Sequence, residues 1–181
     1  MFIIGEGSFD QRRDLILRHA KLDTEVGFLL SMINFEWTLR RSVLVLGRAP
    51  TKELRHGVLS NASGPKDYKR AWKFAQAGCE GLPSLCQIFN GEGEVPFWNI
   101  HKKGRDGILQ AFMLRHKLVH GCVSKPGDNY MWQRISLMLE AAYALEMVAK
   151  SYGKDLNSRT MRIVPLKKKN RIVEIKEDIH E

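Results

Sequence analysis

Long stretches of this chain lack the glycine and proline residues that interrupt helices, and this feature most constrains its fold. Between residues 8 and 46 the only glycine is Gly27 and there is no proline, and residues 128–152 contain neither. The near absence of glycine and proline over segments of this length favours helices. The sequence therefore predicts an all-α fold.

Capping and breaking residues set the expected bounds of the helices. Ser8 can cap a first helix that runs to about Lys21, and Thr24 can cap a second helix, or continue the first, as far as Gly47. Asp128 can cap the last long helix. The other segments expected to be helical are 51–59, 66–77, 83–89, 105–120 and 129–152.

The last residues differ in character from the rest of the chain. Residues 162–166 and 171–175 are two short β-prone runs on either side of Lys167, Lys168 and Lys169. Because 181 residues fit one domain, we expect a helical domain over residues 1–156 and a tail over 157–181. The tail is expected to be either a small β-hairpin or a basic arm.

The composition is that of a basic globular protein. Hydrophobic residues make up 44% of the chain, which is enough to build a core, and the formal net charge is +9. A basic surface concentrates polyanions, of which nucleic acid is the commonest. No apolar run reaches the roughly 18 to 20 residues that a membrane span requires, and the first residues lack the pattern of a signal peptide. We therefore expect a cytoplasmic protein without a membrane partner.

The three cysteines do not form a recognisable metal or disulfide pattern. Cys79, Cys86 and Cys122 are odd in number, and no two have the Cys-x-x-Cys spacing. Reduced thiols are the expected state of all three.

The segment 105–120 carries a charge where an apolar side chain is expected. At roughly 100° per residue, Arg115 falls in line with Ile108, Phe112 and Val119, and Cys122 extends the same stripe. A second stripe contains Leu109, Met113, His116 and His120, and the polar face opposite is narrow: Asp106, Gln110 and Lys117. A helix that is apolar around most of its circumference should be largely covered. The guanidinium of Arg115 must then be paired with an anion or line a cleft.

The segment 24–47 offers a partner for this arginine. Glu36 and Arg40 lie on a stripe that is otherwise apolar and includes Leu29, Ile33 and Val43. A pair of Glu36 with Arg115, or of Glu36 with Arg40, would satisfy these charges. A salt bridge between two core helices would explain Glu36 and Arg115 without any catalytic role.

The run from Arg115 through His116 to His120 and Gly121 resembles the Arg-x4–6-His motif of HEPN domains, named for higher eukaryotes and prokaryotes nucleotide-binding. In that family the motif lies late in a helical bundle and one more long helix follows, as expected here. An early acidic residue, which Glu36 matches loosely, is also typical. The resemblance covers about residues 8–152. It implies a HEPN-like helical bundle that forms a homodimer.

The resemblance also implies metal-independent cleavage of RNA by attack of the 2′-hydroxyl on the adjacent phosphodiester. His120 would be the general base or acid, Arg115 would stabilise the charged transition state, and His116 would orient the phosphate. Glu36 and Arg40 would support the site. No cofactor or metal is implied. Five residues separate Arg115 from His120 by roughly 140° around a helix, so we expect both to border a groove completed by a second chain.

Further expectations concern RNA contacts and biology. The cations expected to contact RNA phosphates are Lys117, Lys167, Lys168, Lys169 and Arg171. The family resemblance implies a toxin or antiviral defence effector, and a toxic nuclease would require a neutralising antitoxin protein.

Other interpretations remain open at this stage. A HEPN-like module that binds RNA, nucleotide or protein without cleavage has the same sequence features. A zinc site on His116 and His120 is disfavoured, because Lys117 stands where a zincin helix has glutamate. The cations of segment 66–77, Lys66, Lys69, Arg70 and Lys73, lie among Tyr68 and Trp72. They form either a solvated face above core aromatics or a contact with RNA.

Overall fold

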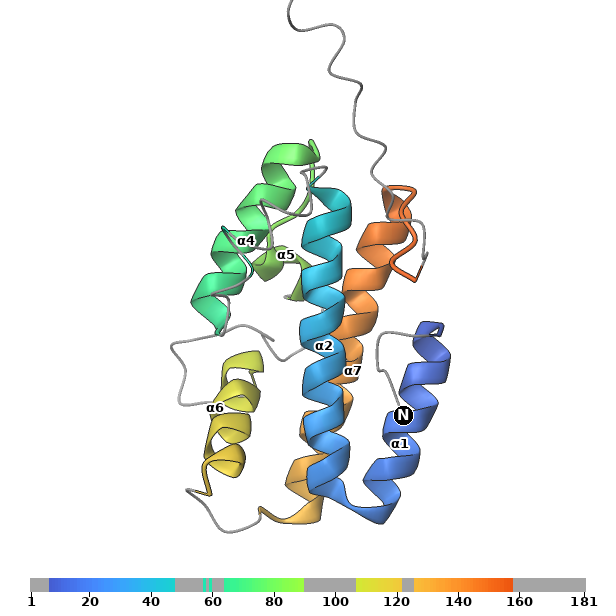
Figure 1. Cartoon of the computed structure of the whole chain (residues 1–181), viewed down its shortest axis with the longest axis vertical. Helices are drawn as coiled ribbons and strands as arrows, with labels where there is room; N and C mark the ends of the chain where they lie inside the picture. Colours follow the sequence, from blue (N-terminus) through green and yellow to red (C-terminus); the bar gives the residue numbers. More distant parts are fainter. Residues whose placement is uncertain are drawn as a thin grey trace, which may run out of the picture.

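The computed structural model describes residues 7–47, 57, 59, 64–89, 107–121 and 126–157. These residues form helices and no strand, so the all-α prediction is confirmed (Figure 1). The helices are α1 (Phe9–Leu22), α2 (Thr24–Leu46), α4 (Pro65–Gly78), α5 (Leu85–Phe89), α6 (Ile108–Val119) and α7 (Asp128–Ser151).

Helix α2 is the centre of the bundle. It packs most extensively against α7 and α1, and it contacts α4 and α6 on another side. Figure 1 shows that α4 lies beside the upper half of α2 and α6 beside its lower half. Helix α6 runs in the opposite direction to α2, so the end of α6 lies toward the beginning of α2.

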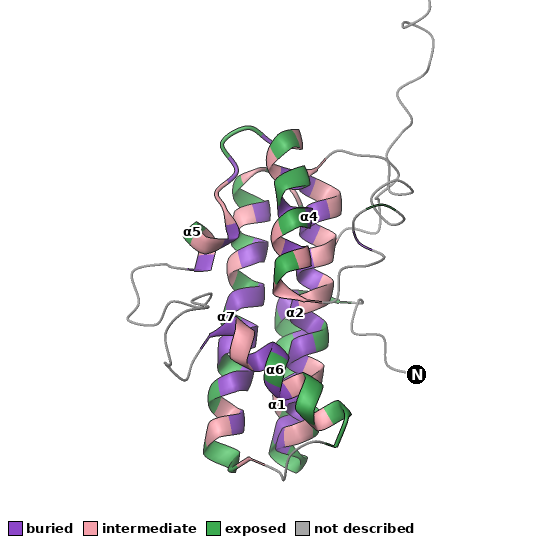
Figure 2. Cartoon of the chain, turned by 90° about the vertical axis from the view of Figure 1, so that its left-hand side faces the viewer, coloured by how far each residue is buried: buried purple, intermediate pink, exposed green. Residues whose placement is uncertain are grey.

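The core is built from aromatic and aliphatic side chains of every long helix. Phe28, Phe35 and Leu39 of α2 are fully buried, as are Tyr68 and Trp72 of α4 to within one per cent. Figure 2 shows how buried and exposed residues alternate along the helices. The expected burial of one side of segment 66–77 is therefore confirmed.

The starts of α2 and α7 differ from the sequence expectation. Ser8 caps α1 through a capping box with Gln11, as predicted. The residue that caps α2 is Asp23, and Gly127 precedes α7. The cap predicted at Thr24 was wrong, because the Asp23 carboxylate accepts hydrogen bonds from the backbone N–H groups of Glu25 and Val26. Asp128 is the first residue of α7 instead of its cap, and its carboxylate accepts a hydrogen bond of 2.7 Å from Thr24 Oγ1, which ties the two helices together.

A buried cation lies between α1, α2 and α7. Arg12 is 1% exposed and forms an ion pair with Glu146, which is 2% exposed. Its Nε donates to Asn34 at 2.9 Å and its Nη1 donates to the Gly7 carbonyl at 2.7 Å, while the guanidinium lies 4.6 Å from the centre of the Trp37 ring. Arg12 therefore joins three helices with every face of its guanidinium in contact.

Some expectations fall outside the described residues. These are the helix over 51–59 except for Gly57 and Leu59, then Cys122, and the entire basic part of the tail with Lys167, Lys168, Lys169 and Arg171. In the described portion, Cys79 and Cys86 are free thiols. No helix among the described segments is long and apolar enough to span a membrane.

Candidate functional site

The second half of α6 carries the residues singled out from the sequence. The helix ends at Val119, His120 follows as its C-terminal cap, and Gly121 has a φ of +65°. This left-handed conformation strains residues other than glycine and ends the helix. The backbone of His120 therefore marks a defined end of α6.

Arg115 forms an ion pair with Glu36 of α2, one of the two pairings predicted from the sequence. The side chains are 35% and 19% exposed, so the pair lies at the border of the core. The guanidinium also approaches the Phe112 ring, with 5.9 Å between its central carbon and the ring centre. Part of the Arg115 charge remains accessible to a ligand.

Burial has a stronger effect on Glu36 than its ion pair. Loss of hydration raises the pKa of the Glu36 carboxyl above its usual 4.5, although the charges of Arg115 and Arg40 and the hydrogen bond from Arg115 act in the opposite direction. Glu36 thus binds its proton more readily than an exposed glutamate. Protonation of Glu36 removes the anion that holds Arg115.

Arg40, whose charge also acts on Glu36, is held by hydrogen bonds of its own. Its Nε donates to the Tyr68 hydroxyl at 3.3 Å and its Nη1 to the Leu59 carbonyl at 2.9 Å. Burial, followed by the nearby Glu36 charge, raises the pKa of Tyr68. Tyr68 was not predicted to belong here, because its position on an apolar stripe indicates only a core residue.

His116 and His120 lie side by side on the solvent face of α6. Their ring centres are 4.3 Å apart and the rings are tilted by 55°. Both side chains are exposed. The spacing of four residues gives this proximity, because side chains at i and i+4 are neighbours on a helix.

An open hollow of about 340 Å³ lies beside this part of α6. Arg115, His116 and His120 all line it, together with Lys117. The remaining lining residues are Gly64 and Pro65 at the start of α4, and Leu109, Phe112, Met113 and Val119. Arg115 and His120 thus border one hollow within a single chain, and the completion of this groove by a second chain stays a prediction.

The apolar surface of α6 is less covered than predicted. Met113 is 46% exposed and Val119 is 62% exposed, and Ile33 of α2 is 50% exposed. Ile33 precedes Glu36 by one turn and Val119 follows Arg115 by one turn. Because the two helices are antiparallel, Ile33 and Val119 lie toward the same end of the bundle from the ion pair. Exposed apolar side chains therefore lie near the charged residues of this site.

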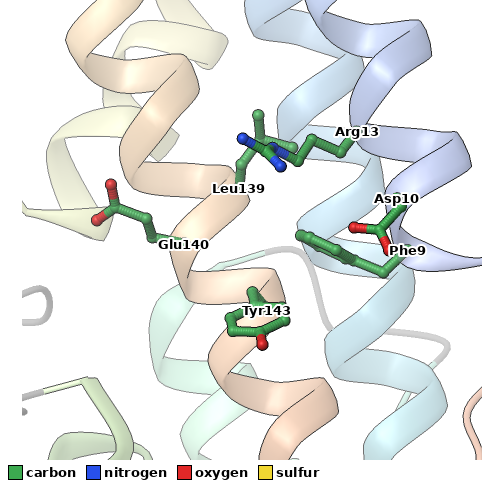
Figure 3. Close-up of a pocket in the computed structure, with 6 residues that line it drawn as sticks. All are labelled: Phe9, Asp10, Arg13, Leu139, Glu140 and Tyr143. Atoms are coloured by element: carbon green, nitrogen blue, oxygen red, sulfur yellow. The ribbon is translucent and has the colours of Figure 1, made fainter.

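A second hollow of about 300 Å³ lies between α1 and α7 and has a different chemistry. It is lined by Phe9, Asp10, Arg13, Leu139, Glu140 and Tyr143. Figure 3 shows Arg13 extending from α1 toward α7, whereas Glu140 points away from Phe9. Its lining residues include the two carboxylates of Asp10 and Glu140, one cation, Arg13, and no histidine. This hollow is therefore a poor match for a polyanion.

Metal-ligating residues do not cluster in the described part of the chain. In those segments no three side chains of the types His, Cys, Asp and Glu come together in a way that could hold an ion. The expectation that no metal is needed stays a prediction.

Comparisons with known proteins found no match to any family model, to any curated protein or to any solved structure. The interpretation of this site therefore depends on its own residues and geometry.

Proposed function

We propose that this protein is a metal-independent endoribonuclease of the HEPN type. The observation that carries the proposal is the convergence of Arg115, His116 and His120 on one open hollow. A cation beside two accessible imidazoles is a suitable set for proton transfer at a phosphodiester.

In the proposed reaction the 2′-oxygen forms a bond to phosphorus and the bond from phosphorus to the 5′-oxygen breaks. His120 accepts the proton from the 2′-hydroxyl, or donates one to the departing 5′-oxygen. Arg115 neutralises charge that develops on the non-bridging oxygens. The products are a 2′,3′-cyclic phosphate and a 5′-hydroxyl end.

The closeness of the two imidazoles supports a homodimer. Attacking and leaving oxygens lie on opposite sides of phosphorus in an in-line displacement. Rings whose centres are 4.3 Å apart on one helix face approach a phosphate from the same side. His116 is thus better placed to orient the phosphate, and a second copy of His120 would supply the opposite proton transfer. The exposed Ile33, Met113 and Val119 are available for contact with that second copy.

The chemistry is tested with an RNA oligonucleotide whose cleavage site has been mapped. The expected products in EDTA carry 2′,3′-cyclic phosphate and 5′-hydroxyl ends, and a single 2′-deoxy substitution at the cleaved nucleotide should block that cut. Cleavage that persists at the deoxy position, or 5′-phosphate products, would contradict the proposal.

A HEPN-like module that binds RNA, nucleotide or protein without cleaving it is the second candidate. The ion pair between Arg115 and Glu36 favours it, because a helix-to-helix salt bridge accounts for Arg115 without catalysis. This candidate predicts RNA binding without cleavage, and binding that survives His120→Ala.

The cellular role follows only from the proposed family. A toxin or antiviral effector in the cytoplasm, restrained by an antitoxin protein, is consistent with a basic nuclease. Co-purification of the chain with a neighbouring acidic protein that suppresses its cleavage of RNA would support this role.

A further inference from the structure

The outer face of α4 carries a row of exposed cations. Lys66, Arg70 and Lys73 are all exposed, and their spacings of four and three residues place them on one stripe. The stripe extends for about 10 Å along the helix axis at 1.5 Å per residue. Asp67 is the only acidic residue of α4 and is half-buried. The stripe is thus a continuous positive surface.

An aromatic ring lies beside this stripe. Phe74 is 48% exposed, whereas Tyr68 and Trp72 of the same helix are buried. Tyr68 and Trp72 therefore belong to the core, and a different aromatic residue of this segment, Phe74, faces solvent. Contact of the segment with RNA stays a prediction. Trp72 also donates from Nε1 to the Pro83 carbonyl at 2.8 Å, which fixes the orientation of α4.

The stripe begins at the hollow of the candidate site. Gly64 and Pro65 line that hollow, and Lys66 is the next residue. Helix α4 then leads away from α6 along the same side of α2 (Figure 1). Exposed residues of α4 and of the end of α6 face the same side in Figure 2. A strand bound in the hollow can therefore continue along α4 without turning round the molecule.

We propose that Lys66, Arg70, Lys73 and Phe74 form a track for single-stranded RNA that continues from the hollow. The cations contact successive phosphates and Phe74 stacks on a base, a combination that suits a single strand of any sequence. The inference rests on the proposed function and adds where the substrate lies outside the cleavage site. The track selects single strands, because bases in a duplex are not free to stack on Phe74.

The first test measures binding in a His120→Ala background, in which cleavage is expected to be slow. The triple variant Lys66→Ala, Arg70→Ala and Lys73→Ala is compared with a matched triple on α1, Arg13→Ala, Arg18→Ala and Lys21→Ala, whose three cations are also exposed. Affinity for a labelled single-stranded RNA is measured at several salt concentrations, and circular dichroism melts confirm that both triples fold.

The α4 triple should weaken binding, and its log–log salt slope should fall by about 0.7 for each lost phosphate contact, so by about 2. The α1 triple should keep the original slope. Equal losses in both triples would overturn the track, as would an unchanged slope in the α4 triple.

Phe74→Ala should weaken binding about fivefold or more with little change in slope, and Phe74→Trp should restore it. Duplex RNA bound as tightly as single strands would also overturn the track.

A second test separates the track from the nuclease. With His120 intact, the α4 triple should raise the KM for a long RNA and leave cleavage of a dinucleotide unchanged. If the intact protein cleaves no RNA but the α4 triple still weakens binding, the proposed function fails and the track stands. If cleavage depends on His120 but the α4 triple binds and cleaves long RNA normally, the track fails and the nuclease stands.

Discussion

In the part of the bundle that the structure describes, two interhelical pairs of arginine with glutamate differ in their surroundings. Arg12 and Glu146 are 1% and 2% exposed, while Arg115 and Glu36 are 35% and 19% exposed. Arg12 also bonds to Asn34 and Gly7 and stacks on Trp37. Arg115 faces a hollow of about 340 Å³ that is also lined by His116 and His120.

This difference separates a structural cation from one available to a ligand. A buried guanidinium with all its faces in contact has no surface left for substrate, and its loss leaves a buried charge behind. A guanidinium at the border of a hollow can stay paired in the free protein and still contact a phosphate. The candidate site therefore differs from an ordinary salt bridge in that its guanidinium is accessible and lies beside two imidazoles.

The largest expected effect is on stability and concerns Arg12. Arg12→Met should lower the free energy of unfolding by about 3–5 kcal/mol, because Glu146 is left buried without its partner. Urea denaturation measures this loss. The double variant Arg12→Met with Glu146→Leu should recover part of it, and a double variant less stable than the single would contradict this account of the pair.

The matching substitution in the pair of Arg115 with Glu36 should affect RNA cleavage strongly and stability only weakly. Arg115→Met should slow RNA cleavage by about 10²–10³-fold, the usual cost of removing a group that stabilises an oxyanion. Its effect on the free energy of unfolding should be about 1 kcal/mol or less, since the pair is partly exposed. Cleavage assays and urea denaturation of the same preparation check both halves. Strong destabilisation with unchanged cleavage would make the two pairs equivalent and contradict the comparison.

A smaller effect is expected at the exposed apolar surface next to Arg115. Val119→Asp should weaken self-association by about tenfold or more, because burying a valine contributes about 1.5 kcal/mol or more. Analytical ultracentrifugation measures the dimer. Leu22→Asp, at an 86% exposed leucine distant in sequence from the motif, is the matched control and should leave association unchanged. Dissociation by both variants, or by neither, would argue against a dimer through α6.

The smallest expected effect is the pH dependence contributed by Glu36. Since burial raises its pKa above 4.5, the stability that this group contributes is fully present below about 4.5 and is lost as pH rises through the raised pKa. The stability of the wild type relative to Glu36→Gln should therefore fall from about pH 4 toward neutral pH and then level off. Urea denaturation across this range measures the difference. A difference that grows with pH would show that the ion pair outweighs burial.

Helical periodicity was sufficient to predict one of the two pairs. Arg115 interrupts an apolar stripe of one segment and Glu36 an apolar stripe of another, so each is visible as a charge in the wrong place. Arg12 gives no such signal, because it lies among Asp10, Arg13 and Asp14 in a segment that looks solvated. Its partner is 134 residues away, and only tertiary packing brings them together.

Periodicity was less informative about what covers a helix. It predicts that Met113 and Val119 are shielded, but it does not distinguish shielding by the same chain from shielding by a second one. Likewise, the caps predicted at Thr24 and Asp128 are polar residues at helix starts, which sequence reasoning assigns to their own helices. In the fold they bond to each other across α2 and α7.

Cleavage of single-stranded RNA in EDTA by the wild type, His120→Ala and His19→Ala tests the central claim most directly. His19 is a half-buried histidine of α1 outside the hollow and serves as the matched control. We expect the wild type and His19→Ala to cleave at similar rates, and His120→Ala to be slower by about 10²–10⁴-fold. Equal cleavage by His120→Ala, or cleavage only after a metal ion is added, would contradict the assignment of this site.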